Sequence, residues 1–117
     1  MAKATDLPIY QAAYDLLIYI TKIVGNFPRN RRILANKLLE DTHELVQCVF
    51  RSNSAKGSAK VPWIEKLQEL LGSIRLSLRL STDLSLITAG QHGNTVMMTT
   101  AVGKQANGWL TYAKGIA

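Results

Sequence analysis

The segment Ile74-Arg75-Leu76-Ser77-Leu78-Arg79-Leu80-Ser81 decides the fold class of this 117-residue chain. Its apolar and polar residues alternate with a period of two, which is typical of a β-strand. Leucine, however, forms helices more readily than strands, and β-branched residues are scarce in the segment. The sequence contains no second convincing strand, and a lone strand would leave its backbone groups unpaired. We therefore predict that the segment is helical.

Proline and glycine divide the chain into four helical stretches. Gly25 and Asn26 mark the first break, a basic stretch over residues 52–60 marks the second, and residues 88–94 mark the third. We expect helices at about 7–25, 30–52, 62–87 and 94–113. The predicted fold is all-α, an antiparallel up-down four-helix bundle forming a single domain over residues 1–117.

The third predicted helix carries apolar residues on two sides. Ile74 and Leu78 are expected to face the core, while Leu76 and Leu80 belong to a second stripe. The first helix is similar: its face around Tyr14 is assigned to the core, which leaves aliphatic residues outside that face. Because a helix with two apolar sides is buried on both, we predict a homo-oligomer; the alternative is that the bundle tilts enough to bury both stripes. The predicted oligomer interface consists of Ile9, Leu16, Ile20, Ile23, Leu76, Leu80, Leu84 and Ile87.

The composition favours a folded and basic protein. The net charge is +6 and the isoelectric point is about 9.7, which favours an anionic partner without indicating a fold. Cys48 is the only cysteine, so no internal disulfide can form. The first residues lack an apolar signal-peptide core, and the most apolar stretch, Leu16 to Val24, is interrupted by Lys22 and is far too short to span a bilayer. We expect a cytoplasmic protein without a membrane partner.

Three arginines occur where a helix least favours cations. Arg29, Arg31 and Arg32 open the second predicted helix, close to the positive end of its backbone dipole. A polyanion would compensate for their charge; a solubilising surface cluster is the alternative. Because aromatic residues do not alternate with the cations, we expect backbone-directed, weakly sequence-specific and salt-dependent binding of RNA and DNA. The candidate nucleic-acid-binding residues are Arg29, Arg31, Arg32, Arg51, Lys56, Lys60, Arg75 and Arg79.

The sequence offers little support for catalysis. Glu40 and His43 have the Glu-x-x-His spacing of di-iron bundles, but no second such pair exists, and His92 lies in the predicted third break. Cys48 borders the apolar face of its helix and is expected to be a small core residue. No phosphate-binding loop, Ser-His-acid set or paired-cysteine motif is present. We predict no metal site, no cofactor and no enzymatic activity.

Several segments together resemble a known protein family. They are Phe27-Pro28-Arg29 before the helix from Ile33 to Arg51, then Ile74-Arg75-Leu76 through Asp83-Leu84, and finally Gly108-Trp109-Leu110. In order and spacing, over roughly residues 7–112, they resemble the accessory variability determinants of diversity-generating retroelements. Relatives encoded within 23S rRNA genes usually carry a Ser-x-x-x-Asn-x-x-Glu-Gly segment in the second helix. This chain has Glu44 to Phe50 there, which favours the retroelement branch.

This resemblance implies a specific biological role. It implies a barrel-like homopentamer with a basic surface, which associates with a reverse transcriptase and its template RNA and is not itself an enzyme. Two alternatives remain open. One is a purely protein-interacting oligomeric scaffold without affinity for nucleic acid, and the other is an undetected enzyme such as a nuclease.

Overall fold

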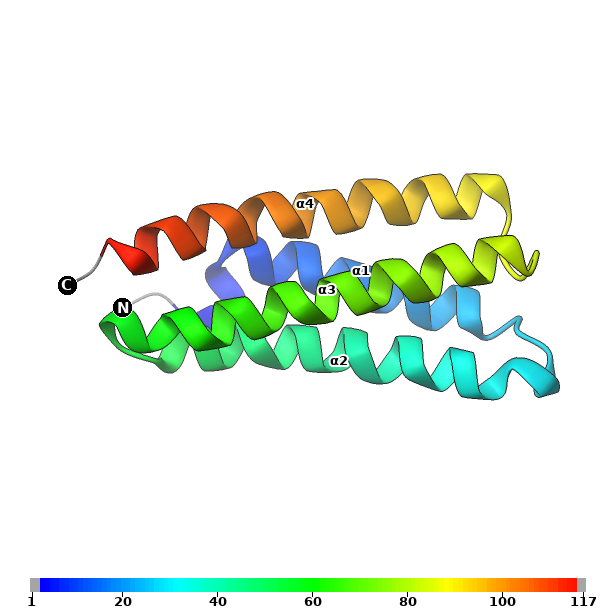
Figure 1. Ribbon diagram of the computed structural model, residues 1–117, viewed down its shortest axis with the longest axis horizontal. Helices are drawn as coiled ribbons and strands as arrows, with labels where there is room; N and C mark the ends of the chain where they lie inside the picture. The colour runs from blue at the N-terminus through cyan, green and yellow to red at the C-terminus, as the bar shows by residue number, and fades with distance from the viewer. Residues whose placement is uncertain (1–2, 116–117) are drawn as a thin grey trace.

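Each long helix of the protein packs against its two neighbours in a square arrangement. The computed structural model describes residues 3–115, and in that range the long elements are α1 (Pro8–Val24), α2 (Arg32–Ser54), α3 (Lys60–Asp83) and α4 (Ala89–Lys114). α1 and α3 each pack against both α2 and α4. The helices alternate in direction along a rod with extents of 48 × 21 × 21 Å (Figure 1). The prediction of an all-helical four-helix fold is confirmed for the described residues.

The alternating segment that decided the fold class is helical, as predicted, and lies within α3. Ile74 and Leu78 are buried in the core, together with Leu67 and Leu71. Leu76 and Leu80, by contrast, are exposed to solvent. The second stripe predicted for this helix is therefore open on the surface of a single copy.

The main core face of α1 is not the predicted face around Tyr14; on that face only Val24 is fully buried, and Tyr10 and Leu17 pack partly against the core. Ile9, Leu16, Ile20 and Ile23 are buried in the core, whereas Tyr14 is exposed. The physical reason is that the aliphatic stripe carries no polar group, while the opposite stripe carries tyrosine and threonine hydroxyls, which are costly to bury without hydrogen-bond partners. Ile87, which follows α3, is also buried in the core. These five buried residues are therefore removed from the predicted oligomer interface, because a single copy already covers them.

The connection between α3 and α4 is shorter than predicted. α3 ends at Asp83 rather than near residue 87, and Ser85 follows with a left-handed φ of 59°. The Leu86 amide donates to the Ser81 carbonyl (2.8 Å) and the Ser85 amide donates to the Thr82 carbonyl (3.0 Å). These are the two hydrogen bonds of a Schellman motif, which satisfies carbonyl groups at the end of the helix.

α4 begins at Ala89 rather than at residue 94, so the predicted third break is helical over most of its length. Thr88 and Gln91 form a capping box: the Thr88 hydroxyl accepts from the Gln91 amide (3.0 Å), and the Gln91 side chain accepts from the Thr88 amide (2.9 Å). These bonds satisfy two backbone donors at the helix start and offset the low helix propensity of Gly90 and Gly93.

The first and second connections contain short 3₁₀ turns, Arg29–Arg31 and Gly57–Ala59. α2 runs from Arg32 to Ser54, so both of its ends lie two residues later than predicted, and α3 begins at Lys60, two residues earlier than predicted. The Lys60 ammonium donates to the Ser52 carbonyl (2.9 Å) and to the Asn53 carbonyl (3.2 Å). Lys60 thereby caps the end of α2, where the helix dipole favours a cation.

Candidate nucleic-acid interface

The groove between α3 and α4 gathers cations and hydrogen-bond donors along the bundle. It consists of two hollows of about 390 and 320 Å³, which share Arg75 and Thr100. We call this surface the basic groove. Its polar and charged lining residues are Gln68, Arg75, Arg79, His92, Thr95, Thr99, Thr100, Lys104 and Asn107.

The position of Arg75 depends on a glycine in the facing helix. A Cβ atom at Gly103 would lie 3.0 Å from Arg75 Nη2 and 3.4 Å from Leu71 Cδ2, so the missing side chain makes room for the guanidinium. Arg75 Nη2 donates to the Thr99 carbonyl at 3.3 Å, which ties the side chain to α4. A guanidinium carries five N–H donors, so this one bond leaves most of them for a ligand.

Arg79 lies one turn further along α3 and forms an exposed ion pair. Arg79 Nε lies 3.3 Å from both carboxylate oxygens of Asp83. An exposed pair of this kind contributes about 0–1 kcal/mol, so a phosphate group can compete with it. In α4, which faces both arginines, no residue is acidic. The groove therefore has two arginines on its α3 wall, and an α4 wall that carries Lys104 and neutral polar groups but no carboxylate.

His92 stands near the end of the basic groove. Its Nδ1 atom lies 2.8 Å from the Thr82 hydroxyl, and that hydroxyl is 2.9 Å from the Leu78 carbonyl. This contact ties the His92 ring to the end of α3.

The other predicted nucleic-acid-binding residues lie at the two ends of the bundle. Arg29, Arg31 and Arg32 lie at the end where α1 connects to α2 and α3 connects to α4 (Figure 1). Arg29 and Arg32 are exposed, and Arg32 Nη2 donates to the Phe27 carbonyl at 3.3 Å. Arg29 and Arg31 belong to the 3₁₀ turn before α2, and only Arg32 lies in the first turn of α2, which contains no acidic residue; cations at this end are unfavourable for the helix dipole.

At the opposite end, two of the three predicted cations are engaged in contacts within the chain. The Arg51 guanidinium carbon lies 5.1 Å from the centre of the Trp63 ring, and Lys60 caps α2. Lys56 is exposed. The structure therefore brings Arg75 and Arg79 together in one groove and adds Lys104, which the sequence reasoning missed. It keeps the two ends of the bundle apart as separate clusters.

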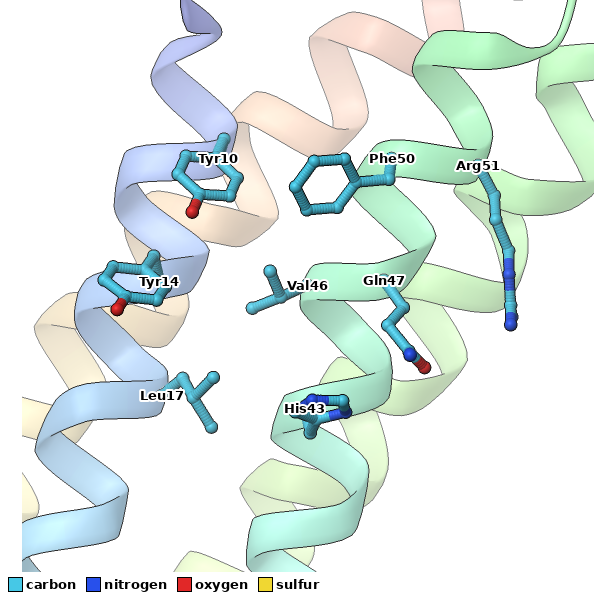
Figure 2. A pocket seen from close by; sticks show the side chains of 8 residues that line it. All are labelled: Tyr10, Tyr14, Leu17, His43, Val46, Gln47, Phe50 and Arg51. Atoms are coloured by element: carbon cyan, nitrogen blue, oxygen red, sulfur yellow. The ribbon is translucent and has the colours of Figure 1, made fainter. Parts of the chain in front are cut away.

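A second groove lies between α1 and α2 and is mainly apolar and aromatic. Two hollows of about 500 and 600 Å³ share Leu17, His43 and Gln47. The Tyr10 ring stacks on Tyr14 with a centroid distance of 5.6 Å and meets Phe50 edge-on at 5.5 Å. Figure 2 shows Tyr10 and Tyr14 on α1 and Phe50 on α2, with the Leu17 and Val46 side chains between the two helices. We call this surface the aromatic groove; it is lined by Tyr10, Tyr14, Leu17, Thr21, Leu39, Glu40, His43, Glu44, Val46, Gln47, Phe50 and Arg51.

A third surface, between α2 and α3, is an exposed apolar patch. The exposed fractions of its members are 88% for Ile33, 71% for Leu76, 45% for Leu80 and 40% for Leu84. Apolar side chains exposed so close together mark interaction sites. This patch borders a hollow of about 460 Å³, which Arg31 and Lys37 also line. We call the four apolar residues the leucine patch; three of them belong to the predicted oligomer interface, and Ile33 is new.

The comparison with known families accounts for this architecture. The family model described as bAvd-like matches residues 7–113. The chain belongs to the bAvd-like family. The resemblance to accessory variability determinants is therefore confirmed, and the link to diversity-generating retroelements is consistent with the family name. No curated protein matched the sequence.

The match includes nearly all of the four helices, so the basic groove of this bAvd-like chain lies within the family region. Among residues 3–115, no three His, Cys, Asp or Glu side chains lie close enough together to hold a metal ion. None of the helices in that range is sufficiently long and apolar to cross a membrane. Cys48 is fully buried, as predicted, and burial followed by the nearby Glu44 carboxylate raises the pKa of its thiol.

Proposed function

We propose that this bAvd-like protein is a non-catalytic accessory subunit that binds RNA and DNA and associates with a reverse transcriptase in mutagenic retrohoming. In this proposal it acts in the cytoplasm as a homo-oligomer, which the family resemblance suggests is a pentamer. The observation that carries the proposal is the basic groove. It places Arg75, Arg79 and Lys104 beside hydroxyl and amide donors, and its α4 wall is without carboxylates.

The shape and chemistry of the groove favour the sugar–phosphate backbone as the ligand. Arginine, lysine, threonine and asparagine are common donors to phosphate oxygens, and such contacts carry no sequence information. No phenylalanine, tyrosine or tryptophan side chain lines the groove, so base stacking has little platform there. Binding in this groove should therefore be driven by counterion release and should weaken steeply with salt.

The test is a titration of fluorescent structured RNA, and separately of duplex DNA, over a range of salt concentrations. The groove variant replaces Arg75, Arg79 and Lys104 with glutamine. A matched control removes the same charge elsewhere by replacing Lys22, Lys66 and Lys114, which are exposed and lie outside the basic groove. If each groove cation contacts one phosphate, the slope of log K against log salt should lose about 0.7–0.9 per residue in the groove variant only.

Equal losses in the two variants would mean that total charge, rather than the groove, controls binding. No affinity of the wild-type protein for either nucleic acid at physiological salt would favour the alternative of a protein-interacting scaffold. The partner can be tested separately by co-purifying the protein with a retroelement reverse transcriptase in the presence of a ribonuclease. Loss of the complex under that treatment would mean that RNA, rather than protein contact, joins the two.

A further inference from the structure

Two apolar surfaces of one copy lack a partner, and they lie on adjacent sides of α2. The aromatic groove opens between α1 and α2, and the leucine patch lies between α2 and α3. The groove exposes Tyr14 and Phe50, and the patch exposes Ile33 and Leu76. Leaving both in water is unfavourable, because apolar area costs about 25 cal/mol per Å² when it is not buried.

The leucine patch and the part of the aromatic groove nearer the α1–α2 connection are bordered by charges of opposite sign, whereas Arg51 lies in the other part of the groove. Glu40 and Glu44 line the aromatic groove at the part nearer the α1–α2 connection. Arg31 and Lys37 line the hollow beside the leucine patch. Lys37 already pairs with Asp41 at 3.0 Å, whereas no ion pair of Arg31 is found among the described residues. Arg31 is thus the cation that remains available to a carboxylate of another molecule.

We propose that the aromatic groove of one copy receives the leucine patch of a second copy. This inference rests on the self-association included in the proposed function, and it specifies which two surfaces meet. The contact buries the exposed leucines against the tyrosine and phenylalanine rings and brings Arg31 of one copy near the glutamates of the other. Each copy uses both surfaces, so a single type of contact covers the exposed apolar side chains of the groove and of the patch.

The two symmetric alternatives are less favourable. Pairing two leucine patches across a two-fold axis would bring Arg31 and Lys37 close to their own copies, and pairing two aromatic grooves would do the same with Glu40 and Glu44. Like charges placed together across an interface are destabilising. Either arrangement would also leave the other apolar surface exposed. A head-to-tail contact avoids both costs, and it forms a ring when the rotation between copies closes.

A mixing experiment distinguishes the head-to-tail contact from the symmetric ones. The patch variant is Leu76→Glu with Leu80→Glu. The groove variant in this experiment concerns the aromatic groove and is Tyr14→Lys with Glu44→Lys. The control is Met97→Glu on α4, whose exposed fraction of 69% matches that of Leu76 and which lies outside both surfaces. Circular dichroism and urea unfolding establish that each variant is folded, and native mass is measured by light scattering.

We expect each variant alone to be a monomer of 12.9 kDa, because each lacks one half of the contact. An equimolar mixture should form a heterodimer with twice that mass and nothing larger, since the intact groove of one chain meets the intact patch of the other. The control should assemble like the wild type. A mixture that stays monomeric, or a patch variant or groove variant that assembles alone, would overturn the proposed contact.

A milder pair of changes guards against misfolding. Glu44→Arg and Arg31→Glu should each weaken assembly by about tenfold, and the double variant should recover most of the wild-type affinity, because the charge pair is restored with reversed sign. Absence of this recovery would count against the pairing. A wild-type protein that is monomeric at all accessible concentrations would refute self-association altogether, without affecting the RNA titration. A groove variant that assembles normally but no longer binds the polymerase would assign the groove to that partner instead.

Discussion

Replacing Gly103 and Gly108 separately with alanine should give different results, although both glycines lie inside α4. In a helix interior, glycine costs about 1 kcal/mol relative to alanine. A Cβ atom at Gly108 would meet nothing within 4 Å, whereas at Gly103 it would lie 3.0 Å from Arg75 Nη2. The first substitution, at Gly108, therefore tests helix propensity alone, and the substitution at Gly103 tests the same propensity together with the space occupied by Arg75.

The expected magnitudes follow from these contacts. Gly108→Ala should raise the free energy of unfolding by about 1 kcal/mol. Gly103→Ala gains the same amount but displaces the Arg75 guanidinium, which lengthens or breaks its 3.3 Å bond to the Thr99 carbonyl. A net hydrogen bond contributes about 0.5–1.5 kcal/mol, so the two effects should nearly cancel. Because the displaced group is the flexible tip of an exposed side chain, we expect no larger penalty.

Urea unfolding at one protein concentration measures both effects. With a slope of about 1–3 kcal/mol per molar urea, the midpoint for Gly108→Ala should rise by roughly 0.3–1 M, while that for Gly103→Ala stays close to the wild type. Gly72→Ala in α3 is a control, since a Cβ atom there also meets nothing within 4 Å. Equal stabilisation by the Gly103 and Gly108 substitutions would refute the claim that Gly103 makes room for Arg75.

Three further predictions concern single residues. Ser85→Gly should raise the thermal midpoint by a few degrees, since a left-handed φ costs a side chain about 1–2 kcal/mol, and this gain should exceed the entropy that glycine adds to the unfolded chain. Thr88→Ala should lower the free energy of unfolding by about 0.5–2 kcal/mol through loss of the cap, while Thr88→Ser should retain most of it, both measured in urea. The Cys48 thiol should react with iodoacetamide at pH 8 far more slowly in the native than in the urea-unfolded protein. Because burial raises its pKa above the ordinary value of 9.0, the unfolded chain ionises first, so stability should fall as the pH rises through that range; Cys48→Ala should lack this component of the fall.

The sequence was sufficient to predict that the chain is helical, but it was not sufficient to predict which face of each helix is buried. Leucine propensity and the lack of a partner strand correctly predicted that Ile74 to Ser81 is helical. For α1, both stripes were apolar enough to be a core face, so periodicity alone could not choose between them. The deciding difference was chemical: the buried stripe is purely aliphatic, whereas Tyr10 and Tyr14 on the other stripe bear hydroxyl groups that favour the edge of the bundle.

The end of α3 and the start of α4 were predicted at the wrong residues for a different reason. α3 ends two residues before Ser85, which adopts the left-handed conformation usually taken by glycine, so no glycine or proline marked the end of the helix. The start of α4 did carry a signal, because Thr88 and Gln91 have the spacing of a capping box. Gly90 and Gly93 concealed it, since glycines in a row of polar residues usually indicate a loop.

The candidate site was predicted only where its residues share one helix. Arg75 and Arg79 are four residues apart on α3, so their proximity followed from helical periodicity. Lys104 joins them from α4, and its contribution depends on which faces of the two helices meet. Arg51 and Lys60 are also basic, but a ring contact and a helix cap already engage them. Charge in the sequence therefore identifies candidates, and only packing shows which of them remain available to a ligand.

In our proposals, the aromatic groove and the leucine patch serve assembly, and the basic groove serves nucleic-acid binding. The aromatic groove and the leucine patch both border α2, and α4 does not neighbour α2 in the square arrangement. A head-to-tail contact through those two surfaces would thus leave α4, which has no acidic residue, on the uncovered side of every copy. Each copy added would repeat the basic groove, so the positive potential would grow with assembly without any change in sequence. A net charge of +6 on a single chain is modest for binding a polyanion, and repetition in a closed oligomer is what would make backbone-directed binding strong.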